Sequence, residues 1–267
     1  MFKYSLDILA ESSYDLNMFK QVQAARGKYK AGGEATRAQI LATALAVFRR
    51  RGLDGATMRE IAKTAGVALG AAYYYFPSKE AIVQAYYDQV QGAHLARVKA
   101  ELADGKHDLL ARLRIAFRAK LDVLQGDRKL LGTLFRYTGE PEHPLSVLGA
   151  GTRANREQSM AVFKLAVGDE RLPEDVRAML PAGLWALHLG MLLYFIYDES
   201  PKQERTRKLA DGILQLLVRA LALVNFPLLA PVRGSLFALL RDAGLFPEPL
   251  AADGPATNFS TNEEAQS

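Results

Sequence analysis

The chain has 267 residues, 49% of them hydrophobic, which is enough to bury a sizeable core without covalent cross-links. It contains no cysteine, so disulfides, thiolate metal sites and cysteine nucleophiles are excluded, and a cytoplasmic location is expected. The formal net charge of +5 is uneven, because the segment from Lys20 to Glu80 holds 11 Lys and Arg against 4 Asp and Glu, a net +7. This excess predicts a polyanionic partner for the N-terminal part alone, although a solvated basic face would have the same composition.

Residues 1–33 show no sustained helical period and end in a basic stretch and a glycine pair. We expect a mobile basic arm that adds phosphate or minor-groove contacts through Arg26, Lys28 and Lys30. Acidic residues interrupt the apolar ones near the start, so no signal peptide is expected. Met18 is an alternative to the first methionine as the start of the protein.

The next segment predicts a helix that begins at a T-x-x-Q capping box, formed by Thr36 with Gln39. Its apolar positions recur at helical spacing and include Leu45 and Phe48. Gly52 supplies a left-handed C-terminal stop.

Two short helices follow. Thr57 with Glu60 forms a second capping box, and Gly66 is expected to take a positive φ in a tight turn. The helix after that turn runs to about Tyr75. A first helix packed behind two short ones joined by a glycine turn predicts a helix-turn-helix domain over residues 34–82.

The run from Thr57 to Val83, TMREIAKTAGVALGAAYYYFPSKEAIV, resembles the signature of the tetracycline-repressor (TetR) family. The matching positions are Thr57, Ile61, Ala62, Ala65, Gly66, Val67, Gly70, Tyr73, Tyr74, Tyr75, Phe76, Ser78, Lys79, Ile82 and Val83. The resemblance covers about residues 36–87, roughly a fifth of the chain. It implies an all-α fold, in which an N-terminal three-helix helix-turn-helix DNA-binding domain precedes a C-terminal helical domain for ligand binding and dimerisation.

The resemblance also implies roles for single residues. Thr57 and Lys79 match positions that contact phosphates, the tyrosines match positions that touch bases and backbone, and Arg59 matches one that reaches a base edge in some members. The residues expected to bind DNA are Arg37, Thr57, Arg59, Leu69, Gly70, Ala71, Tyr73, Tyr74, Tyr75 and Lys79.

The sequence departs from the family pattern at Ala68 and Ala71, where polar residues are usual. Base readout is therefore expected to depend more on Tyr73, Tyr74 and Arg59. Core packing is the alternative role for the tyrosines. However, successive residues of a helix differ by about 100°, so three consecutive tyrosines cannot all face inward.

Beyond this domain, Ser78 caps a helix that extends to about Glu101, and no strand-like alternation occurs. The uncharged stretch from Leu180 to Tyr197 approaches the length of a membrane span, but Pro181 and charged flanks favour a buried helix over a membrane-associated protein. The remaining helices are expected at 106–125, 128–138, 152–167, 174–198, 203–225 and 229–243. Residues 83–246 would form the second domain, and 247–267 a disordered polar tail.

The family resemblance implies that the second domain dimerises through its last long helices and encloses a ligand pocket. We therefore expect a homodimeric repressor that binds a palindromic operator in double-stranded DNA and is released by a small apolar or amphipathic effector. Ordinary core packing also accounts for each candidate pocket residue. These candidates are Phe117, Phe135, Tyr137, Phe163, Trp185, His188 and Tyr194.

Catalysis finds little support. Glu140, Glu142 and His143 lie together, but in a turn-like context, and the four histidines form no i,i+4 ligand pair. We predict no enzyme activity, no metal and no cofactor. A second hypothesis is a DNA-binding regulator whose packed C-terminal domain is controlled by a protein partner or by no ligand at all.

Overall fold

The computed structural model describes residues 32–140, 142–224, 226 and 230–242. Over these residues the chain is helical with no strand, which confirms the all-α prediction. The expected basic arm and C-terminal tail lie almost entirely outside the described residues.

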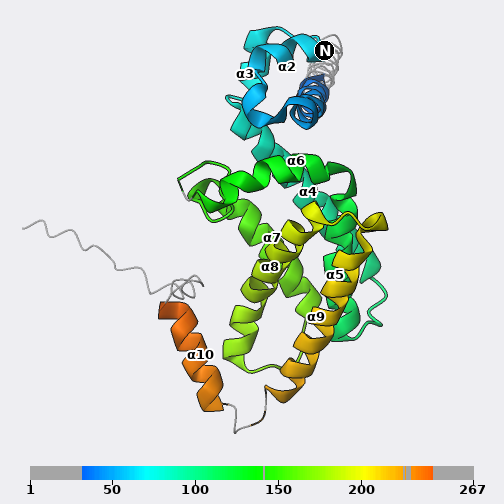
Figure 1. Ribbon diagram of the computed structural model, residues 1–267, viewed down its shortest axis with the longest axis vertical. Helices are drawn as coiled ribbons and strands as arrows, with labels where there is room; N and C mark the ends of the chain where they lie inside the picture. The colour runs from blue at the N-terminus through cyan, green and yellow to red at the C-terminus, as the bar shows by residue number, and fades with distance from the viewer. Residues whose placement is uncertain (1–31, 141, 225, 227–229, 243–267) are drawn as a thin grey trace, which may run out of the picture. The chain divides into compact units, whose positions relative to one another are not determined.

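The N-terminal region is built from a first helix that includes residues 32–55, followed by α2 (Met58–Ala65), α3 (Leu69–Tyr75) and α4 (Lys79–Glu101) (Figure 1). Gly52 has a φ of +72° and Gly66 a φ of +68°, the left-handed conformation expected at both glycines. The first helix nevertheless extends to residue 55, beyond the stop predicted at Gly52. The Ser78 Oγ accepts a hydrogen bond from the Ala81 amide at 3.2 Å, so this cap at the start of α4 is confirmed.

The predicted capping box at Thr36 is wrong. Residues 32–35 are already helical, so the amides near Thr36 lie inside the helix and need no cap. The Thr36 hydroxyl instead donates to the Gly32 carbonyl oxygen at 2.9 Å. The Gln39 Nε2 donates to the Ala65 carbonyl oxygen at 2.8 Å, which ties the first helix to the end of α2.

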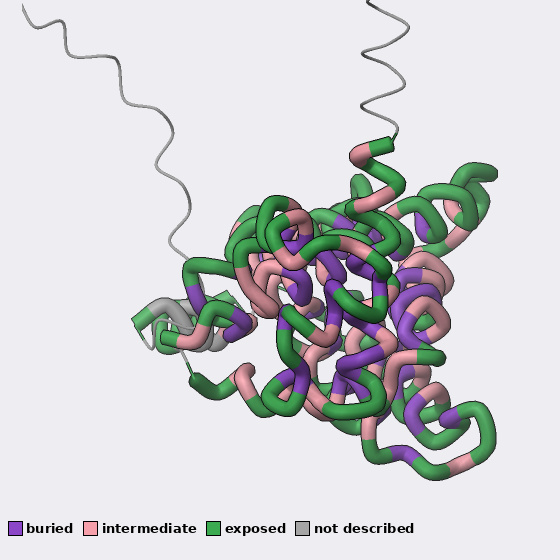
Figure 2. Tube along the Cα trace, turned by 90° about the horizontal axis from the view of Figure 1, so that it is seen from above, coloured by how far each residue is buried: buried purple, intermediate pink, exposed green. Residues whose placement is uncertain are grey.

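The remaining helices lie within three residues of most predicted boundaries. They are α5 (Leu109–Val123), η1 (Gln125–Asp127), α6 (Arg128–Leu134), η2 (Phe135–Gly139), η3 (Ala150–Thr152), α7 (Arg153–Val167), α8 (Glu174–Tyr197), η4 (Pro201–Gln203), α9 (Glu204–Leu223) and α10 (Ala230–Asp242). Figure 2 shows buried and exposed positions alternating along the helices, as expected when each has one face in a core.

The described chain divides into two compact units. The first contains residues 32–97, 120–158 and 195–197, and the second contains 98–119, 159–194 and the described residues from 198 onward. The units thus divide the chain differently from a single cut at residue 83, and the expected functional domain boundaries stay a prediction.

The helix-turn-helix core belongs to the first unit. Ile61 and Phe76 are fully buried together with Leu45 and Phe48 of the first helix, as expected from the sequence. Burying such large apolar side chains stabilises the fold by roughly 1.5–3 kcal/mol each. This core therefore holds α2 and α3 rigidly against the first helix.

A carboxylate joins three elements within the first unit. The Asp127 carboxylate in η1 accepts hydrogen bonds from Arg49 Nε of the first helix at 2.8 Å and from the Tyr86 hydroxyl of α4 at 2.9 Å. Burial and the Asp127 charge raise the pKa of Tyr86 far above its ordinary value, so this hydroxyl stays protonated and donates.

α8 is the one helix in the described ranges that is long and apolar enough to cross a membrane, with a mean hydropathy of 1.6 over its most apolar window. Only 28% of that window is buried within the chain. Leu184, His188 and Phe195 are buried, whereas Leu193 and Tyr194 are exposed. The expected burial within the chain is therefore confirmed for one face only.

Candidate nucleic-acid interface

The turn between α2 and α3 is specified by local chemistry. The Thr57 Oγ1 accepts from the Glu60 amide at 3.1 Å, which confirms the capping role of Thr57 and starts α2. Gly66 ends α2 in the left-handed conformation, and the Val67 amide donates to the Ala62 carbonyl oxygen at 3.0 Å. α3 then begins after Ala68, which makes no side-chain cap hydrogen bond, as its methyl group requires.

α3 presents an aromatic surface to solvent. Tyr74 is 82% exposed and Tyr73 49% exposed, whereas Tyr75 packs against the core, its ring nearly perpendicular to that of Tyr74 with the centroids 5.1 Å apart. Two of the three tyrosines therefore face outward, as the helical geometry predicts. Gly70 is also exposed, and a Cβ added there would meet no atom within 4 Å.

Leu69 differs from the expectation that it faces base edges. It is half-buried and packs against the core, because it shares the inward face of α3 with Ala72 and Phe76. Ala71 is half-buried as well. The outward surface of α3 is therefore narrower than expected and consists mainly of Gly70 and the two tyrosines.

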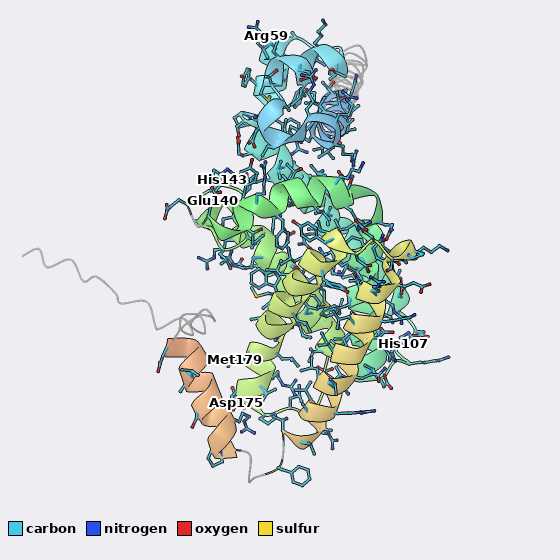
Figure 3. The ribbon with its side chains drawn as sticks, viewed as in Figure 1. Arg59, His107, Glu140, His143, Asp175 and Met179 are labelled. Carbon is cyan, nitrogen blue, oxygen red and sulfur yellow. The ribbon has the colours of Figure 1, made fainter. Side chains whose placement is uncertain are left out.

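The basic residues of the predicted interface lie in different environments. Arg59 and Thr57 are exposed, and Figure 3 shows Arg59 at the outer surface of α2. Arg37 stacks over the Phe76 ring at 4.8 Å from its centroid. The Lys79 Nζ donates to the Leu53 carbonyl oxygen at 2.6 Å, a contact that the sequence did not suggest. An ammonium carries three donors, so this contact leaves Lys79 able to reach a phosphate.

Three of the candidate effector residues form one ring cluster in the second unit. Phe117, Phe163 and His188 are buried, with ring centroids 5.3 Å apart between the phenylalanines and 5.6 Å apart between Phe163 and His188. Trp185 is half-buried and Tyr194 is exposed, and both lie in the same unit. Three of the predicted residues are thus in direct contact.

Phe135 and Tyr137 lie in the first unit instead, and Phe135 is half-buried there. The Tyr137 hydroxyl donates to the Asp54 carboxylate at 2.6 Å, and its ring stacks on His143 at 4.2 Å. These contacts hold Tyr137 beside the end of the first helix and not within the ring cluster. The His143 Nδ1 accepts from the Leu145 amide at 3.1 Å, so this histidine orders the loop seen after η2 in Figure 3.

One candidate for ligand binding, Lys120 of α5, was not predicted from the sequence. Its side chain is fully buried, and its Nζ donates to Gln91 Oε1 of α4 at 2.9 Å. A signal was present, because Lys120 falls in line with the buried positions Leu113, Phe117 and Leu124 of an otherwise apolar helix face.

Two family models match the chain. The model described as "Bacterial regulatory proteins, tetR family" matches residues 40–86, and "Tetracyclin repressor-like, C-terminal domain" matches residues 112–231. Together they cover the helix-turn-helix and most of the helices after α4.

Among curated relatives, the HTH-type transcriptional activator FasR of Mycolicibacterium smegmatis is 31% identical over 171 residues, which cover 62% of this chain and 74% of FasR. The regulator TtgR of Pseudomonas putida is 35% identical over 85 residues, 32% of this chain and 40% of TtgR. RutR of Escherichia coli is 37% identical over 97 residues, 36% of this chain and 45% of RutR. The chain thus spans less than half the length of the latter two.

Solved structures share the fold. A TetR regulator from Nitrosomonas europaea superposes with a TM-score of 0.55 at 19% identity, covering 67% of this chain and 96% of that one. FadR of Bacillus subtilis, solved in complex with stearoyl-CoA, gives a TM-score of 0.53 at 19% identity, covering 68% of this chain and 97% of FadR.

Proposed function

The chain belongs to the TetR family of DNA-binding transcriptional regulators, and on this premise we propose that it is a homodimeric repressor that a small apolar or amphipathic ligand releases from a palindromic operator. The observation that best supports sequence-specific DNA binding is the exposed aromatic surface of α3. Large aromatic side chains are normally buried, so two adjacent exposed tyrosines on a rigid helix need a partner to cover them.

The proposed reading surface combines Tyr73 and Tyr74 of α3 with Arg59 of α2. The tyrosine rings offer apolar contact to thymine methyl groups, and an exposed arginine can pair with guanine through two hydrogen bonds. Thr57 and Lys79 are the proposed phosphate contacts, which set position but carry no sequence information. Because Ala68 and Ala71 lack polar groups, base readout on α3 itself is mostly apolar.

The proposed dimer uses the second unit. Leu209, Leu216 and Leu223 are exposed on α9 at intervals of seven residues, so they form one apolar stripe along the helix. α8 adds exposed Leu193 and Tyr194. A second copy of the chain would cover these side chains, and two copies of α3 about 34–36 Å apart would read the two halves of a palindrome.

We propose that the ligand releases the protein from its operator by moving α4. This helix begins directly after the helix-turn-helix and contributes residues to both units. A ligand that favours one position of α4 would shift α3 and so change the spacing of the two reading helices. The stearoyl-CoA in FadR is an amphipathic ligand, which supports the class of effector proposed for this chain.

A second candidate function is a DNA-binding regulator without a ligand. The direct ring contacts among Phe117, Phe163 and His188 favour it, because a closely packed core leaves less room for an effector. FasR carries the name of an activator, so the direction of regulation is also tested below.

The experiment is a gel-shift titration of the purified chain against the promoter region beside its own gene and against random duplex at physiological salt. The proposal expects a preference of at least about 10³-fold for a site in the promoter. Equal affinity for both duplexes would exclude a sequence-specific regulator. A reporter placed behind the bound promoter then separates a repressor from an activator by the sign of its change.

A further inference from the structure

Lys120 is a charged group placed in the interior. It is 2% exposed, in α5 next to the buried Leu121, and its only hydrogen bond in the described chain is to the amide oxygen of Gln91. A lysine ammonium has three donors and is costly to bury without an opposite charge. Burial lowers the pKa of Lys120 to about 7, because removal from water disfavours the charged ammonium.

The carboxylates on the neighbouring turns are committed elsewhere within the first unit. Asp122, two residues away on α5, pairs with Arg97 at 2.7 Å. Asp88 of α4 accepts from Asn155 at 2.5 Å. Asp127 of η1 accepts hydrogen bonds from Arg49 and Tyr86, as described above. No carboxylate of the described residues forms an ion pair with Lys120, so a full counter-charge would have to come from outside this part of the chain.

Three polar side chains lie on the face of α4 that Lys120 reaches. Tyr87, Gln91 and His94 recur at intervals of four and three residues, so they share one side of the helix. His94 is fully buried, and Tyr87 and Gln91 are partly buried. Burial raises the pKa of the Tyr87 hydroxyl, which therefore stays protonated and can donate a hydrogen bond.

We propose that Lys120, with Tyr87, Gln91 and His94, binds the anionic head group of an effector, and that the effector is an amphipathic carboxylate. An ammonium, an amide, a hydroxyl and an imidazole together match a carboxylate, whose oxygens accept several hydrogen bonds. The buried Leu121 and Leu124 beside them favour an apolar remainder. The inference rests on the proposed function, because it names the ligand class of the same regulator.

The test compares decanoate with decanol, which has the same chain length and no charge, by titration calorimetry on the full chain. Wild type should bind decanoate at least about tenfold more tightly than decanol, since a hydrogen-bonded charge pair accounts for that much affinity. Lys120→Met, of similar volume, should lose this preference. Gln91→Glu replaces only the amide nitrogen by an oxygen and so places a carboxylate beside Lys120. It should also abolish the preference for decanoate, and it leaves the volume of the side chain unchanged.

Proton uptake provides a second readout. At about pH 8 most of the Lys120 side chains are neutral, so decanoate binding should take up close to one proton, measured from the heat in two buffers of different ionisation enthalpy. His94 and Tyr87 are the other titratable groups on the facing side of α4. Loss of the uptake in Lys120→Met but not in His94→Gln assigns the proton to Lys120.

Three results would overturn the inference: no binding of decanoate to wild type, equal affinity for decanoate and decanol, or an unchanged preference in Lys120→Met. Circular dichroism confirms that each variant is folded. The gel-shift without added ligand separates this inference from the proposed function. Specific DNA binding with no decanoate preference rejects only the ligand class, whereas a decanoate preference without specific DNA binding rejects only the regulator.

Discussion

The buried Lys120 makes the stability of the protein depend on pH in a way that one substitution should remove. Burial lowers its pKa from 10.5 to about 7, so between these values the unfolded chain binds a proton that the folded chain does not. Stability is therefore highest above the unfolded pKa and falls as the pH falls toward 7, by about 1.4 kcal/mol per pH unit. Over the whole interval the loss amounts to about 4 kcal/mol.

The assay is urea unfolding of wild type and Lys120→Met at fixed protein concentration between about pH 7.5 and about pH 9.5. The difference between their free energies of unfolding should change by about 2–3 kcal/mol over this range, with the variant gaining relative stability at the lower pH. Titration of His94 and all other groups is common to both proteins and cancels in the difference. Lys164→Met, at an exposed position, is the matched control and should give a flat difference. A flat difference for Lys120→Met would refute the reasoning.

Three further predictions concern DNA binding and assembly. Tyr74→Ala and Arg59→Ala should each lose about 1–3 kcal/mol of discrimination between operator and mismatched sites, measured by competition gel shifts; unchanged base preference would remove that residue from the reading surface. Lys79→Ala should weaken binding to all duplexes alike and lower the salt slope by about one, whereas an unaltered slope would leave Lys79 only its contact with Leu53. Leu216→Glu introduces a charge at a side chain that is 65% exposed in the single chain and should give monomers in analytical ultracentrifugation, while a dimer of wild-type strength would place the interface elsewhere.

Local features of the DNA-binding region were predictable because they depend on neighbouring residues. Thr57 and Ser78 cap helices through side-chain oxygens that reach amides three residues away. Gly66 takes a positive φ that other residues avoid. The exposure of at least one of Tyr73 and Tyr74 also followed from helical geometry, since three consecutive side chains of a helix cannot all face inward.

The structure departs from the expected orientations and contacts where a partner distant in sequence decides the outcome. The Gln39 side chain resembles half of a capping box, but it donates to Ala65, which is 26 residues away. Leu69 directly follows the turn between α2 and α3 and was expected on the outward face of α3, but its side chain packs against the core. Tyr137 was grouped with pocket aromatics, yet it binds Asp54, 83 positions away in the chain.

The sequence by itself determined the helix-turn-helix, its caps and the family to which the chain belongs, because these depend on short-range hydrogen bonds and on a long local motif. Only the tertiary structure decided which polar groups lose contact with water. Lys120 is one basic residue among 34 in the sequence, and it becomes exceptional only when α4 and α5 pack around it. Burial is a property of the assembled core, and the energy of a charge depends on that burial more than on its neighbours in the chain.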